Sequence, residues 1–346
     1  MQCNAFEQVE IIMESRPRTA CVIGGTGFVA SSLVKLLLQK GYSVNTTVRD
    51  KENGAKISHL LALQNLGNLK IFQADLTDES SFDDPITGSD FVFHVATPVN
   101  FASEDPQNDM IKPAIGGVIN VMKACAKAGT VERVVFTSSA ATVSINQLNE
   151  TGLVMDENNW TDVEFLTSVK PPTWGYAVSK TMAEKAAWKF AKEYNINLIT
   201  IIPSLMAGPS LTPEIPSSVT LATSLIIGNK FLMNGLNGMQ KLSGSISLAH
   251  VKDVCRAHIF VAEKDSAYGR YICCAVNTSV CELADFLKQR YPMYNIPTDL
   301  GDVPSKAKLI ISSDKLLNEG FKFEYGIEEI YDQSVAYLKD KGLLCD

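Results

Sequence analysis

The stretch Thr19-Ala-Cys-Val-Ile-Gly-Gly-Thr-Gly-Phe-Val-Ala-Ser-Ser-Leu-Val-Lys-Leu-Leu-Leu38 decides the fold of this chain. Its first part, Ala20 to Ile23, has the length and β-branching of a buried strand, and apolar residues recur at helical spacing from Phe28 onward. Between them the small residues are spaced Gly24-x-x-Gly27-x-x-Ala30. Glycine permits a tight turn and lets a pyrophosphate approach the start of the following helix, so the stretch predicts a dinucleotide-binding turn. The alternative is an ordinary strand-to-helix turn that binds no nucleotide.

The composition excludes several classes of protein. The 346 residues are 46% hydrophobic and 20% charged, which is typical of a globular protein with an ample core. The net charge of −7 argues against a nucleic-acid partner, and no apolar run reaches the roughly 20 residues that span a bilayer. The 8 cysteines lack C-x-x-C spacing, and the 4 histidines lack metal-ligand spacing. We therefore expect a cytoplasmic protein with reduced thiols and no metal.

Short β-rich runs alternate with helical patterns as far as residue 202, which predicts right-handed βαβ units. The predicted fold is α/β: a Rossmann-type doubly wound parallel sheet with a smaller C-terminal α/β substrate lobe. After the first strand and helix, the predicted strands are Tyr42–Val48, Leu69–Phe72, Asp90–Val95, Val131–Phe136 and Leu198–Ile202, and the helices are Ala55–Leu63, Ile111–Lys127 and Tyr176–Glu193.

The regular alternation ends near residue 204, which sets the predicted domain boundaries. Residues 18–204 form the dinucleotide-binding domain, and 205–346 form mainly the substrate lobe, with 245–275 returning to the first domain. Residues 1–17 are expected to be a flexible tail, and Met13 is an alternative start. The lobe is predicted to hold one apolar helix at Val219–Ile227, a strand at Ser245–Val251 that rejoins the sheet, and helices at Asp253–Ala262, Cys281–Gln289 and Ile327–Lys339.

Tyr176 and Lys180 are four residues apart on a predicted helix and therefore share one face. A phenol with its ordinary pKa near 10 exchanges protons poorly at neutral pH, and a neighbouring ammonium lowers that pKa. Ser139 follows a predicted strand and can hydrogen-bond a substrate oxygen where charge changes during reaction. This spacing often occurs by chance on a protein surface, but together with the glycine turn it predicts Ser139, Tyr176 and Lys180 as catalytic residues.

The end of the second strand predicts the choice of cofactor. NAD-binding sheets usually place an acid there, whereas this chain has Arg49, with Lys56 on the next helix. Two cations suit a 2′-phosphate, so we expect NADPH; Asp50 is the rival, as an acid for the ribose hydroxyls. The candidate cofactor-binding residues are Gly24, Thr26, Gly27, Phe28, Val29, Arg49, Lys56, Asp75, Leu76, Val95, Ala96, Thr97, Tyr176, Lys180 and Pro203.

The chain resembles the extended short-chain dehydrogenases/reductases, whose catalytic trio maps onto Ser139, Tyr176 and Lys180. It is most similar to the plant flavonoid reductases of the anthocyanidin-reducing group. The similarity is carried by Asn45–Asp50, Ala96–Asp105, Pro171–Tyr176 and Gly238–Gln240, and it covers most of Thr19 to Leu344.

This resemblance implies an NADPH-dependent double reduction of anthocyanidins (cyanidin, pelargonidin, delphinidin) to 2,3-cis-flavan-3-ols of the epicatechin type. It also implies a cytosolic location and leaves room for association with other flavonoid enzymes. Aromatic and methionine side chains suit a planar polyphenol. The candidate substrate-binding residues are Val99, Phe101, Ser144, Trp174, Met206, Met239 and Gln240, and core packing is the alternative for each.

Three other functions remain as alternatives. A dihydroflavonol 4-reductase or related aryl-ketone reductase is the nearest, but those enzymes usually carry an asparagine where this chain has Ser144. A sugar-nucleotide epimerase would need basic residues for a diphosphate, and residues 204–245 are poor in arginine. A non-catalytic dinucleotide sensor would keep the glycines and lose the catalytic trio, which is intact here.

Overall fold

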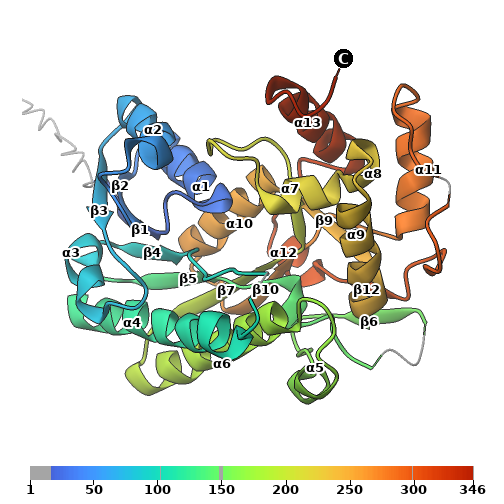
Figure 1. The fold of residues 1–346 in the computed structure, drawn as a ribbon. Coiled ribbons are helices and arrows are strands. Elements are labelled where there is room, and N and C mark those ends of the chain that lie inside the picture. Colours follow the sequence, from blue (N-terminus) through green and yellow to red (C-terminus); the bar gives the residue numbers. More distant parts are fainter. Residues whose placement is uncertain (1–16, 102, 148–150, 298, 346) are drawn as a thin grey trace, which may run out of the picture.

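The computed structural model describes residues 17–101, 103–147, 151–297 and 299–345. Its centre is a seven-stranded sheet in which every neighbouring pair is parallel (Figure 1). This confirms the predicted Rossmann-type sheet. In spatial order its strands are β10 (Gly269–Cys273), β7 (Leu198–Pro203), β5 (Arg133–Thr137), β4 (Phe91–His94), β1 (Thr19–Ile23), β2 (Ser43–Val48) and β3 (Leu69–Gln73).

Helices cover both faces of this sheet, so its central strands β4, β5 and β7 are buried along their whole length. On one face lie α1 (Phe28–Gln39), α2 (Gly54–Leu63) and α10 (Val251–Glu263), with α1 packed against α10. On the other face lie α3 (Asp83–Ile86), α4 (Lys112–Ala128) and α6 (Trp174–Tyr194), with α4 packed against α6 (Figure 1). The strand order reverses between β1 and β4, and ligands bind such sheets at that point, beyond the carboxyl ends of the strands.

A smaller lobe lies beside the sheet and has its own core, which includes Leu225, Leu248 and Tyr331. Its three-stranded sheet has the order β11 (Val276–Thr278), β9 (Ile246–His250), β8 (Leu205–Ala207), and β6 (Leu153–Met155) pairs separately with β12 (Leu309–Ile311). The remaining helices are α5 (Val163–Val169), α7 (Ser217–Ala222), α8 (Ser224–Ile227), α9 (Lys230–Ser243), α11 (Val280–Arg290), α12 (Asp314–Asn318) and α13 (Ile327–Asp340).

The strand predicted at Ser245–Val251 exists, but the prediction that it rejoins the central sheet is wrong. It forms β9, which pairs with β8 and β11 in the lobe. The strand that returns is β10, which pairs with β7, and helix α10 returns with it to pack on α1. An apolar strand can be buried equally well in either sheet, so its sequence does not choose between them.

The segment 204–245 is more helical than the single helix predicted there. The expected Val219–Ile227 helix is broken at Thr223 into α7 and α8, and Thr223 Oγ1 donates to the carbonyl of Val219 at 2.7 Å. Helix α9 follows, capped by Asn229 and ended by Gly244 in the left-handed conformation. Its glycines and asparagines are poor helix formers, so composition alone favoured a loop.

Two predictions concern the N-terminus. The flexible tail at 1–17 and the alternative start at Met13 fall almost entirely outside the residues that the structure describes.

Within the described ranges, no helix is long and apolar enough to cross a membrane.

Candidate active site

The glycine turn between β1 and α1 is shaped by close backbone contacts. Gly24 has φ of +93°, and a Cβ atom there would lie 2.8 Å from the Cβ of Ala96, beyond the end of β4. Gly25, which the sequence pattern did not single out, is also restricted, because a Cβ there would clash with Thr46 Oγ1. Both positions therefore exclude a side chain, as a tight turn beneath a ligand requires.

The start of α1 is open to an anion. Gly27 is exposed and serves as the N-cap without a side-chain hydrogen bond, and the first turn of α1 contains no acidic residue. The first N–H groups of a helix lack partners within it and attract negative charge. Thr26, Phe28 and Val29 surround this point, and Val29 is buried. The turn therefore fits the pyrophosphate of a dinucleotide.

A hollow of about 330 Å³ lies at the carboxyl ends of β2 and β3. Arg49 and Asp75, two of the candidate cofactor-binding residues, both line it. The pKa of Asp75 is lowered, first by its hydrogen bonds with Thr77 and less by the charge of Arg49. Lys51 is the second cation in the lining, whereas Lys56 is exposed in the first turn of α2 and does not belong to the lining. The complete lining is Arg49, Lys51, Gln73, Ala74, Asp75, Asp78 and Ser81.

The other candidate cofactor residues lie at or just beyond the ends of neighbouring strands. Leu76 packs closely against Gly117 of α4, where a Cβ atom on the glycine would clash with the leucine side chain. Val95 packs on the core above the sheet, and Pro203 is the buried last residue of β7. Thr97 accepts a hydrogen bond from Lys180 and so joins the β4 end to helix α6.

The three predicted catalytic side chains meet at the end of β5. Ser139 caps a short 3-10 turn after β5, and its hydroxyl is hydrogen-bonded to the Tyr176 phenol from α6. One turn further along α6, Lys180 is 3% exposed, and its ammonium donates to Thr97 Oγ1 at 2.9 Å and to the carbonyl of Thr137 at 2.7 Å. The helix therefore places phenol and ammonium along one face, as their spacing predicted.

Burial dominates the electrostatics of this site. It lowers the pKa of Lys180 to about 8, and the charge of Glu184 opposes that shift. Burial also raises the pKa of Tyr176, while the hydrogen bond with Ser139 lowers it. Burial and the Ser139 hydrogen bond shift the pKa of Tyr176 in this structure, and the expected lowering by Lys180 is not seen. The Lys180 ammonium donates to Thr97 and Thr137.

The loop after β4 packs on the start of α6. A Cβ on Gly175 would clash with the Cβ of Pro106, so only glycine admits this loop so close to Tyr176. Phe101, on the same loop, is 55% exposed, and its ring centroid lies 5.4 Å from that of Tyr176. An exposed aromatic ring beside the phenol is suited to contact a flat substrate.

Two of the predicted substrate residues have their polar groups occupied by the protein. Ser144 is 1% exposed, and its hydroxyl donates to the carbonyl of Ala140 at 3.0 Å. Gln240 is 1% exposed, accepts from the N–H of Val280 and donates to the carbonyl of Pro304. Both are therefore structural in this state of the protein, which a residue's position in a motif does not reveal.

The remaining four candidates for the substrate site differ in exposure. Val99 is exposed on the same loop as Phe101. Trp174, Met206 and Met239 are partly buried, each at the margin of a different apolar cluster. They come from α6, β8 and α9, so both the central sheet and the lobe contribute to the group.

Sequence reasoning missed Glu184, a buried carboxylate four residues after Lys180 on α6. Tyr176, Lys180 and Glu184 form an unbroken series at four-residue spacing on α6, so the signal was present in the sequence. Among the described residues, no cluster of three or more His, Cys, Asp or Glu side chains could hold a metal ion.

A glycine turn at the point where strand order reverses, beside a Ser–Tyr–Lys group, defines a dinucleotide-dependent oxidoreductase of the short-chain type. The chain belongs to the NAD dependent epimerase/dehydratase family, whose model matches residues 20–274, and within it to the plant flavonoid reductases.

Similarity to individual proteins extends over nearly the whole chain. An anthocyanidin reductase ((2S)-flavan-3-ol-forming) from Vitis vinifera is 75% identical over 94% of this chain and 97% of its own length. The crystal structure of vestitone reductase from alfalfa (Medicago sativa) is 36% identical, with a TM-score of 0.80 over 94% of this chain and 99% of that one. Yeast methylglyoxal/isovaleraldehyde reductase Gre2, complexed with NADPH, is 25% identical, with a TM-score of 0.78 over 94% of this chain and 100% of that one.

Proposed function

We propose that this chain is an NADPH-dependent anthocyanidin reductase, which converts anthocyanidins such as cyanidin to 2,3-cis-flavan-3-ols. The observation that carries the proposal is the 75% identity with the grapevine enzyme over 94% of the chain. The Ser139–Tyr176 hydrogen bond and the buried Lys180 beside them support a working catalytic site. The cytosol, which keeps thiols reduced, is the proposed location, and association with other flavonoid enzymes is proposed with it.

The choice of NADPH rests on the charges at the ends of β2 and β3. Arg49 lines the hollow there with Lys51, and both can pair with a 2′-phosphate. The NADPH bound to the yeast relative is consistent with this choice. When bound, the cofactor supplies hydride. The glycine turn would hold its pyrophosphate and Lys180 the hydroxyls of its nicotinamide ribose.

The stoichiometry follows from the structures of substrate and product. Conversion of a flavylium cation to a neutral flavan-3-ol adds three hydrogens and removes one positive charge. The balance requires two hydrides and one proton, so each product consumes two NADPH. Carbons C2 and C4 of the cation are electrophilic and take the hydrides, and the proton goes to C3. Since one bound NADPH carries one hydride, the cofactor must be exchanged between the two steps.

The side chains of the site have separate tasks in this scheme. Tyr176 would transfer the proton. The Ser139 hydroxyl opposes the rise that burial causes in the pKa of this phenol, which supports that role. Phe101 lies against the phenol and would cover one face of a flat substrate. Val99, Trp174, Met206 and Met239 are proposed to complete an apolar slot, while Ser144 and Gln240 support its walls.

The test is product analysis with cyanidin and NADPH that carries deuterium on the transferred hydrogen. The flavan-3-ol should contain two deuterium atoms, one at C2 and one at C4, and two NADPH should be oxidised per product. Unlabelled NADPH in deuterium oxide should instead place one deuterium at C3.

The same assay separates the proposal from its nearest rival. A product with a single transferred deuterium, or faster turnover of dihydroquercetin than of cyanidin, would reassign the chain as a dihydroflavonol 4-reductase or related aryl-ketone reductase.

A further inference from the structure

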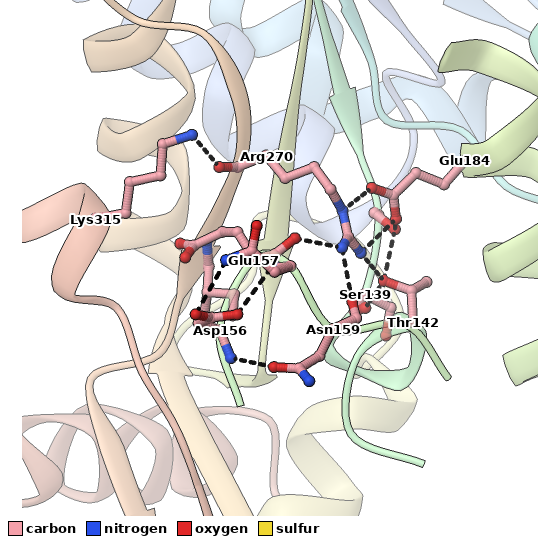
Figure 2. A network of polar contacts seen from close by, with 11 residues as sticks. Ser139, Thr142, Asp156, Glu157, Asn159, Glu184, Arg270 and Lys315 are labelled. Atoms are coloured by element: carbon pink, nitrogen blue, oxygen red, sulfur yellow. Dashed lines mark hydrogen bonds and ion pairs between the residues drawn. The ribbon is translucent and has the colours of Figure 1, made fainter. Parts of the chain in front are cut away.

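A buried ion pair, Glu184 with Arg270, lies beside the turn that carries Ser139 (Figure 2). Glu184 is 0% exposed and lies one turn beyond Lys180 on α6. Its carboxylate accepts from Arg270 Nε at 2.7 Å and from Ser138 Oγ at 2.5 Å. Arg270, on β10, is 8% exposed, so both charges are removed from water and each depends on the other.

The guanidinium of Arg270 joins several segments that are distant in sequence. It donates to the carbonyls of Glu157 at 2.7 Å and Asn159 at 2.8 Å, and to Thr142 Oγ1 at 3.2 Å. One face of it stacks on Trp160, with 3.7 Å from the guanidinium carbon to the ring centroid. A planar group with its donors engaged in fixed directions holds such segments more rigidly than a lysine ammonium would.

These contacts end on both sides of Ser139. Ser138 donates to Glu184, and Thr142 Oγ1, which accepts from Arg270, donates to the carbonyl of Ser139 at 2.9 Å. The turn that carries the catalytic serine is therefore held from behind by both members of the ion pair. The Ser139 side chain contacts Tyr176 on the side of the turn away from the ion pair.

Glu184 also acts on Lys180 through its charge. The pKa of Lys180 is lowered by burial, and Glu184 raises it. The other titratable groups near this ammonium are His94 on β4 and Tyr176 on α6, with Arg270 behind Glu184. Burial lowers the pKa of His94 to about 3, so His94 is neutral at physiological pH and contributes no charge. Glu184 is thus the negative charge that favours the ammonium form of Lys180.

We propose that Glu184 and Arg270 are positioning residues for the reduction, because they fix the Ser138–Thr142 turn against Tyr176 and place a carboxylate behind Lys180. This inference rests on the proposed catalytic roles of Ser139, Tyr176 and Lys180. It assigns to β10, an edge strand supplied by a distant part of the chain, a direct influence on the catalytic geometry. The competing view is that the pair contributes to folding alone.

The decisive variant is Glu184→Gln. The amide can accept from Arg270 and donate to Ser138 Oγ, so the shape of the network survives while the negative charge is lost. At pH 7 we expect kcat/KM for cyanidin to fall roughly tenfold or more, because small displacements of catalytic groups are costly. The ratio of variant to wild-type kcat/KM should fall further as pH rises toward 9. Without the charge of Glu184, Lys180 loses its proton at a lower pH in the variant than in the wild type. Taking the ratio at each pH removes the pH dependence of the flavylium itself.

Asp253→Asn is the matched control. Asp253 is also 0% exposed and pairs with an arginine, Arg256, but it holds the backbone at Glu324 and Tyr325 and not the catalytic turn. The Asp253→Asn variant should lose about as much thermal stability as Glu184→Gln. Its ratio of kcat/KM to that of the wild type should stay constant across pH. If Glu184→Gln also gave a ratio that is constant with pH, or unchanged kcat/KM, the positioning role would be refuted.

Two milder variants keep the inference testable if Glu184→Gln folds poorly. Ser138→Ala removes one contact to the pair and should lower kcat more than it raises KM, with little change in melting temperature. Arg270→Lys keeps the charge and should lower kcat without moving the alkaline limb of the pH profile. Full activity in both variants would overturn the inference.

The assay distinguishes failure of this inference from failure of the proposed function. It is run with cyanidin or dihydroquercetin, whichever the wild type reduces. If the wild type is active, Tyr176→Phe is inactive, and the variants of the pair behave as wild type, only the inference fails. If Tyr176→Phe keeps full turnover, or the wild type reduces neither compound, the catalytic assignment fails, and the inference with it.

Discussion

The two halves of the central sheet carry their functional groups in different ways. At the β1–β2–β3 edge, Arg49 and Lys51 are exposed around an open hollow, and both lie within three residues of the end of β2. In the β5–β7–β10 half, Lys180, Glu184 and Arg270 are 3%, 0% and 8% exposed. The first two lie on α6, and Arg270 comes from β10, far along the chain. One half offers charge to a ligand in contact with water, and the other holds charge away from water.

The difference teaches what a substitution does in each half. An exposed cation contributes modestly, because water and salt screen its interactions. A buried charge interacts strongly with its neighbours, and its removal leaves partners unsatisfied. We therefore expect large effects in the β5–β7–β10 half and graded effects at the β1–β2–β3 edge.

The largest effect is expected for Tyr176→Phe, which removes the hydroxyl proposed to transfer the proton and keeps the ring that contacts Phe101. The turnover of cyanidin should fall by about 10²-fold or more, while NADPH binding stays within about twofold of wild type. Steady-state kinetics and fluorescence titration measure the two quantities. Tyr194→Phe, at the exposed end of the same helix, is the control and should be near wild type. Near-full turnover in Tyr176→Phe would contradict the expectation that substitutions in the β5–β7–β10 half have the largest effects.

The second prediction concerns stability and pH. The pKa of Lys180 is about 8 in the folded protein, below the value of about 10.4 in an unfolded chain. Burial of the ammonium therefore destabilises the fold below pH 8, and the cost disappears as pH rises from about 8 to about 10.4. Relative to Lys180→Met, the wild type should gain about 2 kcal/mol of unfolding free energy between pH 7 and pH 9.5, as measured by urea denaturation. A difference that is constant with pH would show that this lysine is better solvated than its burial indicates.

The third prediction addresses the exposed half. Arg49→Ala should lower the ratio of kcat/KM for NADPH to that for NADH about tenfold, with little change for NADH itself. Lys56→Ala, outside the hollow, should change the ratio less than Lys51→Ala, which lines it. Equal use of NADPH and NADH by the wild type would favour the rival view, in which Asp50 binds the ribose hydroxyls.

The smallest effect is expected for Phe101→Ala. The ring is 55% exposed and packs on Tyr176, so its loss should raise KM for cyanidin a few-fold and change kcat little. Phe231→Ala is the control, since Phe231 is 83% exposed on α9. An equal change in both variants would indicate that Phe101 has no specific contact with the substrate.

The sequence predicted those features that depend on neighbours along the chain. The glycine turn and the Tyr176–Lys180 spacing are local, and the structure contains both as expected. The pairing of β9 in the lobe and the return of β10 depend on contacts between distant segments, which periodicity does not encode. The Gln240 amide is occupied by Val280 and Pro304 for the same reason, so its burial could not be foreseen.

The position of β10 also bears on how the protein is made. Among the strands of the central sheet, β10 is the last to leave the ribosome, and α7, α8, α9 and α10 are synthesised between β7 and β10. A nascent chain that ends after β7 already contains Ser139, Tyr176 and Lys180, but it lacks Arg270, the partner of Glu184. The parts of this domain proposed to bind the cofactor and to catalyse would thus mature at different times during translation, with the Ser138–Thr142 turn set last.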